Sequence, residues 1–496
     1  MKKVIIIGGG LGGLSSAITL AHAGFHVELY EKNRHFGGKM MPIQLGDYSF
    51  DFGPNTITMP SVFKQVIEQT GERADDYFEM IKLENHTRNI FPDGTHFDFS
   101  SNQQTVLSQL QKVDPAGARH YDSFIKEITR LFKLSERYFL PRTFRSWRDY
   151  TSPSLGAAMM RVRPLQTLDS FFRSYFSNPR IIEAYNRYAT YIGSSPFQAP
   201  ATFAMIAYLE MVEGVYYVKG GNVKIAEAFA SLAKKMGVSL HSESQVKKVL
   251  VADNKATGVE LQNGEKVMAD HVIMNADLLK AYPELVAEKD RPSFKNDKVD
   301  KIDPSISAFV ILAGINKRFT QLKHHTVYFS DDYQQEFNDL FVNKKYSAKP
   351  TIYICNSSHT DPGRSPKGDN LFILVNAPAL PPNGKLQIEP VAYKKLIFET
   401  LSSHGLDLTQ HIVEEKIITP SDIAAQFGAH RGALYGVSAN RKKDAFLRPQ
   451  NTSKDIKNLY FVGGSTHPGG GSPMVTISGL NVARSIIKME QYNKIS

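Results

Sequence analysis

The spacing of apolar residues changes twice within the first 30 residues of the chain. Residues 4–7 are an unbroken β-branched run, which predicts a short strand buried on both faces. Leu14, Ile18 and Ala21 follow at helical spacing, and Gly24 ends that helix. Residues 27–30 then alternate like a second strand. The pattern therefore predicts a strand, a loop, a helix and a strand, which is the repeating unit of a parallel α/β sheet.

The loop between the first strand and the helix contains G-x-G-x-x-G. Its glycines permit a tight turn, a close approach of the backbone to a pyrophosphate, and packing of the helix on the strand. The acid at the end of the second strand can accept hydrogen bonds from ribose hydroxyls and would repel a 2′-phosphate. The alternative is a degenerate site that keeps the fold and binds nothing. We expect a dinucleotide site formed by Gly8, Gly9, Gly10, Leu11, Gly12, Gly13 and Glu31.

A second glycine pair, Gly37-Gly38, follows Glu31 by six residues and precedes Lys39, and the segment 51–54 (Asp-Phe-Gly-Pro) interrupts a predicted strand. These features resemble the flavin-dependent amine oxidase and phytoene desaturase superfamily, whose members carry E-x₅-G-G-[RK] after the first nucleotide-binding unit. The resemblance implies non-covalent FAD and contacts from Gly38, Lys39 and Pro54. It also implies that the backbone of Val246 touches the adenine, although a simple core valine is the alternative.

Near the C-terminus an apolar run at 459–462 leads into a glycine-rich loop, and a helix is predicted from about Met474. A strand, a glycine-rich loop and a helix again favour an anion site, and this loop is long enough to run beneath a ring system. We expect FAD to contact Gly464 and Met474. Gly464 stands where many flavoproteins have an acid that binds the ribityl chain, so that contact must come from backbone.

The sequence G-G-S-T-H-P-G-G-G-x-P-x-V at 463–475 is similar to the carotenoid desaturase branch of the superfamily, and within it to the diapocarotenoid enzymes of Gram-positive bacteria. The resemblance covers nearly the whole chain. It implies FAD-dependent oxidation of a terminal methyl group of a 4,4′-diaponeurosporene-type polyene to an aldehyde. Desaturation of a diapophytoene- or phytoene-type polyene is the alternative, and a non-catalytic prenyl-binding protein of the same fold is the alternative from another class.

With 496 residues the chain is too long for one core. We predict an α/β fold in which a Rossmann-like FAD-binding domain (1–80, 215–290 and 420–496) is interleaved with an α+β substrate domain (81–214 and 291–419). Aromatic and aliphatic residues at helical spacing in the substrate domain form either plain core or the wall of a polyene tunnel. These are Phe124, Ile128, Leu131 and Phe132, and then Phe171, Phe172, Tyr175 and Phe176.

The composition restricts the classes of protein that remain. A single cysteine, Cys355, excludes an internal disulfide and a Cys-rich zinc or iron–sulfur site. The chain has no run of 18 or more apolar residues, so no membrane-spanning helix is expected. The apolar run at 4–7 is too short for a signal peptide, and we expect a cytoplasmic protein.

Positive charge is concentrated in one segment of a chain whose net charge is +10. Residues 126–163 contain nine basic and three acidic residues, interleaved with aromatic and apolar ones. This pattern favours an anionic leaflet, and no nucleic-acid-binding motif accompanies it. We expect peripheral association with the inner face of the cell membrane, to which Arg142, Arg145 and Arg148 contribute; a solvated helix face is the alternative.

No side chain can accept the electrons from an allylic C–H bond, so the flavin must perform the oxidation. His467 is the titratable residue of the C-terminal glycine loop and is our candidate catalytic residue; a structural hydrogen bond is its alternative role. We find no Ser/His/Asp pattern, metal-ligand spacing or P-loop in the sequence.

Overall fold

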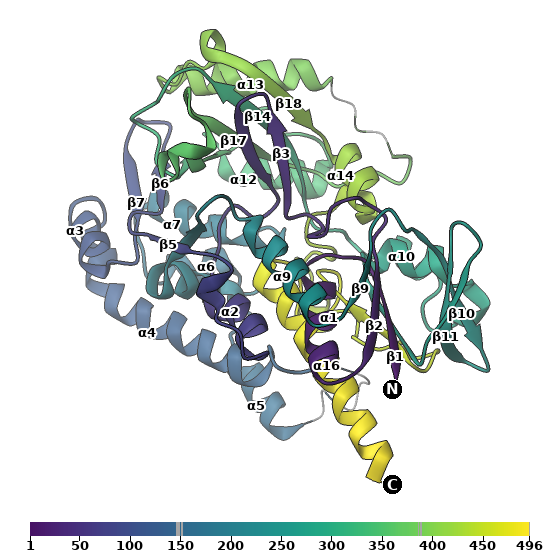
Figure 1. Ribbon diagram of the computed structural model, residues 1–496. Helices are drawn as coiled ribbons and strands as arrows, with labels where there is room; N and C mark the ends of the chain where they lie inside the picture. The colour runs from purple at the N-terminus through teal and green to yellow at the C-terminus, as the bar shows by residue number, and fades with distance from the viewer. Residues whose placement is uncertain (145–148, 150–151, 385, 387–388, 496) are drawn as a thin grey trace.

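The computed structural model describes residues 1–144, 149, 152–384, 386 and 389–495. A five-stranded parallel sheet contains the nucleotide-binding unit (Figure 1), in the order β19 (Leu459–Val462), β13 (His271–Asn275), β1 (Lys3–Ile7), β2 (His26–Tyr30) and β9 (Ser239–His241). The residues at 4–7 are buried on both faces, as their continuous apolar sequence predicts.

Each face of this sheet packs against a different layer. Val4 and Ile6 pack with α1 (Leu11–His22), α9 (Lys224–Lys235) and α16 (Ser472–Ile495). Ile5 and Ile7 pack instead with α10 (Leu278–Leu285) and with an antiparallel sheet of β10 (Val246–Ala252), β11 (Lys255–Leu261) and β12 (Lys266–Met268). Helices and strands thus enclose the five strands on both sides.

A second, mixed sheet has seven strands. Its order is β18 (Ile412–Ile418), β14 (Ser307–Ile315), β17 (Asn370–Ala377), β16 (Ile352–Asn356), β15 (His325–Tyr328), β6 (Thr87–Ile90) and β7 (His96–Phe99). One face packs on α13 (Pro390–Ser403). The opposite face meets the hairpin β3 (Met41–Leu45) and β4 (Tyr48–Phe52), together with α14 (Pro420–Phe427).

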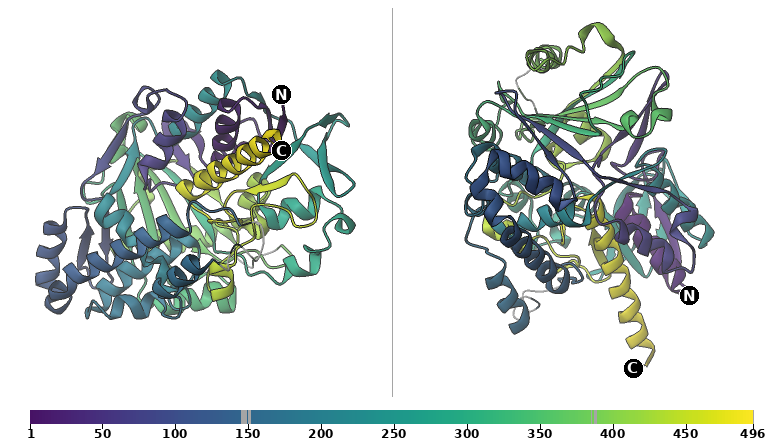
Figure 2. Two further views of the ribbon diagram at one scale, coloured as in Figure 1. Left: turned by 90° about the horizontal axis from the view of Figure 1, so that it is seen from below. Right: turned by 90° about the vertical axis from the view of Figure 1, so that its left-hand side faces the viewer.

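A helical layer lies beside the second sheet, away from β1 and β2 (Figure 2). It contains α3 (Gln103–Val113), α4 (Pro115–Tyr138), α5 (Pro153–Arg161), α6 (Leu168–Arg173), α7 (Pro179–Asn186) and α8 (Met205–Tyr208). Both aromatic stripes of the sequence lie here, and most of their members form one buried core. The helical spacing fails at Tyr175 and Phe176, because α6 ends at Arg173.

The remaining described elements connect these layers. β5 (Met80–Leu83) pairs with β8 (Val215–Val218). The other α-helices are α2 (Pro60–Glu68), α11 (Asn296–Asp300), α12 (Tyr333–Asn338) and α15 (Lys442–Phe446). Short 3₁₀ or π segments include the turns at Ser357–His359 and Pro362–Arg364.

The five-stranded sheet takes its strands from all three segments that the sequence assigns to FAD binding, and the seven-stranded sheet from both segments of the substrate part. The hairpin β3–β4 nevertheless packs on the seven-stranded sheet, although it lies in the first FAD segment. The exact domain boundaries stay a prediction. Among the described residues, no helix is long and apolar enough to cross a membrane.

Candidate cofactor and substrate site

A cavity of about 640 Å³ is lined by residues of both large sheets. The nucleotide side is made of backbone-rich turns, including Gly8, Gly10, Gly12, Gly464 and Gly470. The other side is apolar and comes from the seven-stranded sheet and the helix α14. The cavity therefore joins the two glycine loops, which are 450 residues apart in the sequence, to an apolar wall.

The turn after β1 requires glycine for reasons of space as well as conformation. Gly8 has φ +99°, and a Cβ there would overlap the carbonyl oxygen of Asn275. A Cβ at Gly13 would overlap the carbonyl oxygen of Gly8, so Gly13 serves the close packing of α1 on the sheet. Gly10 is the N-cap of the 12-residue helix α1 and provides no side-chain cap. The first N–H groups of α1 are thus available to an anion.

Glu31 is buried at the end of β2 and lines the cavity. Its Oε2 accepts a hydrogen bond from the Gly9 N–H and its Oε1 accepts one from the Asn33 N–H, each at 2.8 Å. Because a carboxylate offers about four lone-pair positions, these two bonds orient the group and leave capacity for hydroxyl donors. Val246 lines the same region.

The second glycine pair lies directly against the first loop. Gly10 and Gly37 form a β-bridge, and a Cβ at Gly38 would lie 3.1 Å from the Gly10 Cα. The Lys39 Nζ donates to the carbonyl oxygen of Leu434 at 2.6 Å. Desolvation by burial lowers the pKa of Lys39, and the Asp277 carboxylate opposes that change.

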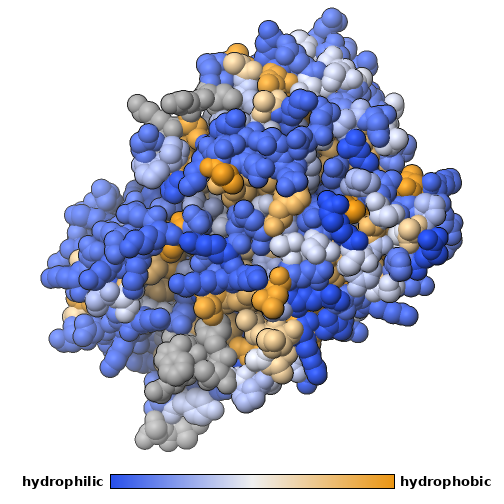
Figure 3. All heavy atoms as spheres, turned by 180° about the vertical axis from the view of Figure 1, so that it is seen from behind, coloured by the Kyte–Doolittle hydropathy of each residue, from blue (hydrophilic) through white to orange (hydrophobic). Residues whose placement is uncertain are grey.

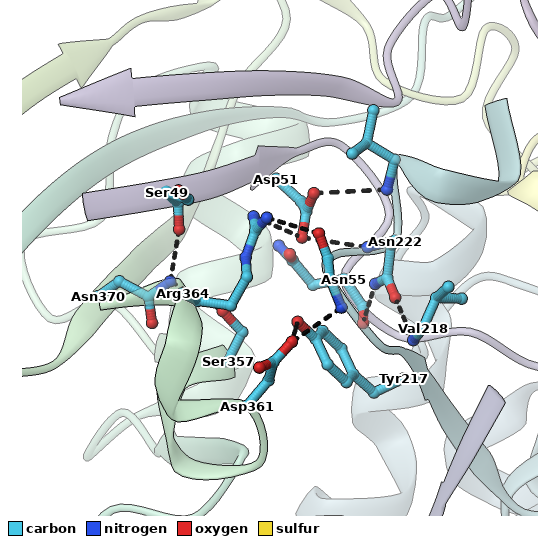
Figure 4. Close-up of polar contacts among 12 residues, drawn as sticks. Ser49, Asp51, Asn55, Tyr217, Val218, Asn222, Ser357, Asp361, Arg364 and Asn370 are labelled. Carbon is cyan, nitrogen blue, oxygen red and sulfur yellow. Dashed lines mark hydrogen bonds and ion pairs between the residues drawn. The ribbon is translucent and has the colours of Figure 1, made fainter. Parts of the chain in front are cut away.

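A buried polar cluster supports the cavity wall at Gly53 and Pro54 (Figure 4). Asp51 is paired with Arg364 at 3.2 Å and accepts a hydrogen bond from the Asn222 N–H at 3.1 Å. The Asn222 Nδ2 in turn donates to the Pro54 carbonyl at 3.2 Å. Burial raises the pKa of Asp51, against the effect of the Arg364 guanidinium. The cluster fixes the turn after β4 to the loop before α9.

Arg364 and Asn222 were not predicted from the sequence. The segment 51–54 is visible as a motif, but nothing in it identifies these two partners of Asp51.

The C-terminal glycine loop approaches the cavity mainly through its backbone. A Cβ at Gly464 would lie 3.3 Å from the Gly470 Cα, and one at Gly470 would lie 2.8 Å from the Tyr435 Cβ. Met474 is not among the lining residues; it packs against a small core around Met59 and Val62. Gly9 and Gly13 are also outside the lining.

His467 is not among the lining residues of this cavity. Its Nε2 lies 2.8 Å from the Phe139 carbonyl oxygen, to which it donates, and its ring meets Phe144 edge to face at 4.6 Å. Burial lowers the pKa of His467 to about 4. This environment fits a neutral, structural histidine, which is the alternative role that the sequence left open.

The apolar wall combines two strands and two stacked rings. Ala308 and Val310 of β14 and Phe372 and Leu374 of β17 face the cavity. Phe52 and Phe427 lie beside them, with ring centroids 5.1 Å apart and nearly parallel planes. The aromatic stripes at 124–132 and 171–176 are not part of this lining.

This donor set fits an FAD molecule. An anion-accepting helix N-terminus, an oriented buried carboxylate and glycine-lined walls that a Cβ would fill all border one cavity.

Comparisons with known proteins agree with this geometry. The model of the family described as flavin containing amine oxidoreductase matches residues 11–487. The chain is 35% identical to a 4,4′-diapolycopene oxygenase of a Methylomonas species over 98% of each chain. It is 32% identical to a 4,4′-diaponeurosporene oxygenase of Staphylococcus haemolyticus, over 99% of this chain and 98% of that protein. The predicted resemblance and the flavin cofactor are thereby confirmed.

Solved structures show the same fold at low sequence identity. An oxidoreductase from Methanosarcina mazei superposes with a TM-score of 0.63 at 15% identity, over 97% of this chain and all of that one. A putrescine oxidase bound to putrescine gives a TM-score of 0.62 at 11% identity, over 98% and 99%. The predicted α/β fold is thereby confirmed.

Proposed function

Because the chain belongs to the flavin containing amine oxidoreductase family and is an FAD-dependent oxidoreductase, we propose that it oxidises a terminal methyl group of a diapocarotenoid to an aldehyde. The substrate is a hydrophobic polyene of the 4,4′-diaponeurosporene type. The observation that carries the proposal is the cavity that pairs glycine turns with an apolar sheet face. The relatives named as diapocarotenoid oxygenases over nearly their full length support the choice of substrate.

We assign the cofactor contacts as follows. Glu31 accepts hydrogen bonds from the ribose, and Val246 borders the adenine. The turn at 8–13, together with Gly38 and Lys39, holds the pyrophosphate, while Pro54 and Gly464 border the flavin end. When bound, FAD supplies the redox chemistry that no side chain can provide. Gly9, Gly13 and Met474 do not line the cavity, and we propose that they shape it indirectly. The Gly9 N–H orients Glu31, and Gly13 allows α1 to pack on the sheet. Met474 packs against the neighbouring core.

The chain's own contribution to the reaction is to position the polyene and exclude water. Val310, Phe372 and Leu374 offer no hydrogen-bonding group, so an apolar chain against them displaces water without leaving a polar atom unsatisfied. Methyl oxidation with dioxygen balances as R–CH₃ + O₂ → R–CHO + H₂O. We assign no catalytic base, since His467, the residue expected in that role, does not line the cavity and donates to the Phe139 carbonyl instead.

The test is expression in a bacterium that makes 4,4′-diaponeurosporene, followed by analysis of its pigments. A new pigment with a terminal aldehyde is the expected result. Additional double bonds without aldehyde would instead identify a desaturase. Unchanged pigment from a protein without flavin colour would indicate a prenyl-binding protein of the same fold.

We also propose that the protein binds the inner face of the cell membrane, where such a polyene dissolves. Met160 of α5 and Leu165 are about three-quarters exposed, and α5 lies at the same edge as the end of α16 (Figure 1). The face in Figure 3 is mostly hydrophilic with scattered apolar side chains, which suits contact at the lipid headgroups rather than deep insertion.

The basic segment carries less free charge than its sequence suggests. Arg130 and Arg163 both pair with Glu127 and hold the pKa of that carboxyl at about 2. Arg145 and Arg148 lie outside the described residues, whereas Lys126, Lys133 and Arg142 are described. The sites for mutation are therefore Lys133, Arg142 and Met160.

Co-sedimentation with vesicles tests this proposal. The parent should bind vesicles that contain anionic lipid more strongly than zwitterionic vesicles. The triple variant Lys133→Gln/Arg142→Gln/Met160→Glu should bind the anionic vesicles severalfold more weakly than the parent. The matched control is Lys395→Gln/Lys416→Gln, which removes two exposed charges from α13 and β18. Equal loss in both variants would contradict a localised membrane surface.

A further inference from the structure

Three side chains with metal-binding atoms meet inside the second sheet, outside the cavity lining described above. His324 precedes β15, and His325 of β15 lies opposite Cys355 of β16 in the antiparallel register. One ligand atom from each lies within 4.8 Å of the others. All three side chains are at most 4% exposed.

The hydrogen bonds of the two histidines leave the same ring nitrogen open on each. The Nδ1 of His324 lies 2.6 Å from the Thr360 hydroxyl, and the Nδ1 of His325 lies 2.8 Å from the Tyr353 hydroxyl. Both Nε2 atoms are buried and have no hydrogen-bond partner among the residues that the structure describes. An unpaired buried polar atom costs free energy, and two adjacent ones indicate a missing partner. With Nδ1 donating to a hydroxyl, each Nε2 carries a lone pair, which is the arrangement found in metal-ligating histidines.

The charge around the cluster decides which ion suits it. Arg187, which acts on His325, lies 3.9 Å from Glu210, and His86 lies 3.8 Å from the same carboxylate. Arg364, which acts on Cys355, lies 3.2 Å from Asp51. An ion bound by one thiolate and two neutral imidazoles would be neutral overall if it were Cu⁺, and would carry one positive charge if it were Zn²⁺. Thiolate and imidazole ligands select these ions over calcium and magnesium, which prefer oxygen.

We propose that His324, His325 and Cys355 form a buried binding site for one thiophilic metal ion of the Cu⁺/Zn²⁺ class. Nitrogen and sulfur ligands bind such ions at about 2.0–2.1 Å and about 2.3 Å, so ligand atoms in a closed site lie roughly 3.3–3.8 Å apart. Because the ligand atoms already lie within 4.8 Å of one another, contraction by at most about 1.5 Å completes the site. Because Cys355 lies opposite Phe372 in the sheet, the ion would fix the strand next to the cavity wall.

The experiment is an anaerobic titration of the reduced, full-length, flavin-loaded protein with Cu⁺ and, separately, Zn²⁺, in competition with a chromophoric chelator. We expect one equivalent of at least one ion, with an affinity at least 100-fold weaker in Cys355→Ser and His325→Gln. Tyr353→Phe and Thr360→Val remove the partners of the Nδ1 atoms and should weaken binding about 10–100-fold. The matched control is His359→Gln, an exposed histidine one residue before Thr360.

Flavin content and the unfolding temperature establish that each variant is folded. If Cys355→Ser and His325→Gln lose flavin, the metal affinity of Thr360→Val is the deciding measurement, because this substitution alters a side chain that is only partly buried. The proposal is overturned if the parent binds neither ion at micromolar concentration, or if the control loses as much affinity as the ligand variants. These readouts do not involve pigment, so they are independent of the proposed reaction.

Discussion

The two walls of the cavity differ in how the sequence specifies them. The nucleotide side is built from turns in which a few consecutive glycines set the backbone path, so a stretch of about ten residues contains most of the information. The sheet side is built from strands that meet only in the fold, with β14 between β17 and β18 although about 55 to 100 residues separate them along the chain. Short-range steric requirements can be recognised in a sequence, whereas long-range pairing cannot.

The largest effect should come from the tightest turn. Gly8→Ala should reduce bound flavin per chain more than tenfold, because the new Cβ would overlap the Asn275 carbonyl and displace the loop. Flavin absorbance of the purified protein measures this. Gly24→Ala is the matched control: Gly24 also has positive φ, at +85°, but within the described part of the chain no atom lies within 4 Å of a Cβ there. Equal flavin loss in both variants would mean that backbone strain, rather than close approach, makes Gly8 necessary.

The next effect tests a contact on the side that the sequence leaves unspecified. Arg364→Met removes the partner of the buried Asp51 carboxylate and should lower the free energy of unfolding by about 3–5 kcal/mol in urea denaturation. Lys367→Met breaks the exposed pair with Asp47 and should leave the urea midpoint nearly unchanged. A small cost for Arg364→Met would show that Asp51 is supported by its backbone donors alone.

The pair Asp51–Arg364 illustrates why sequence analysis reached only part of the site. Asp51 lies in a recognisable motif, but its partner is 313 residues away, and nothing near Arg364 distinguishes it from other surface-type arginines. The proposed metal ligands have the same property: His325 and Cys355 are 30 residues apart and become neighbours only through the register of β15 and β16. Their spacing along the chain therefore does not indicate a metal site.

The apolar wall was hidden for another reason. All nine residues of β14 are buried, so its sequence lacks the alternation that would indicate which face meets a ligand. The aromatic stripes of the helical layer were visible because they are local, and they turned out to form a separate core. The aromatic stripes were easy to recognise because their residues repeat at helical spacing, and this spacing says nothing about whether they lie near the cavity.

A matched pair of phenylalanine substitutions separates wall from core. Phe372→Leu and Phe124→Leu should each cost roughly 1–1.5 kcal/mol of stability, since both rings are buried and most of the volume is kept. Of the two, only Phe372→Leu should lower polyene oxidation per bound flavin severalfold, because Phe372 lines the cavity and Phe124 does not. Pigment yield normalised to flavin content measures this. A comparable fall for Phe124→Leu would extend the substrate path into the helical layer.

The smallest effect at neutral pH is expected at His467, the one residue for which the sequence suggested catalysis. His467→Gln should leave oxidation per bound flavin within about twofold of the parent, whereas loss of a general base costs about 10²–10⁴-fold. Its stability should show a distinct pH signature. The pKa of His467 is about 4 in the folded protein, against about 6.5 in an unfolded chain, so the unfolded state binds more protons between these values.

Above pH 6.5 His467 is neutral in both states and does not reduce the parent's free energy of unfolding. As the pH falls towards 4, proton binding by the unfolded chain lowers that free energy by about 3 kcal/mol. Glutamine does not titrate, so denaturation at pH 7 and pH 4.5 should show the variant gaining stability relative to the parent at the lower pH. A pH-independent difference would mean that the pKa of His467 is the same in the folded and the unfolded chain. A turnover lowered 100-fold at full flavin content would instead restore its catalytic role and move the reacting groups towards the C-terminal loop.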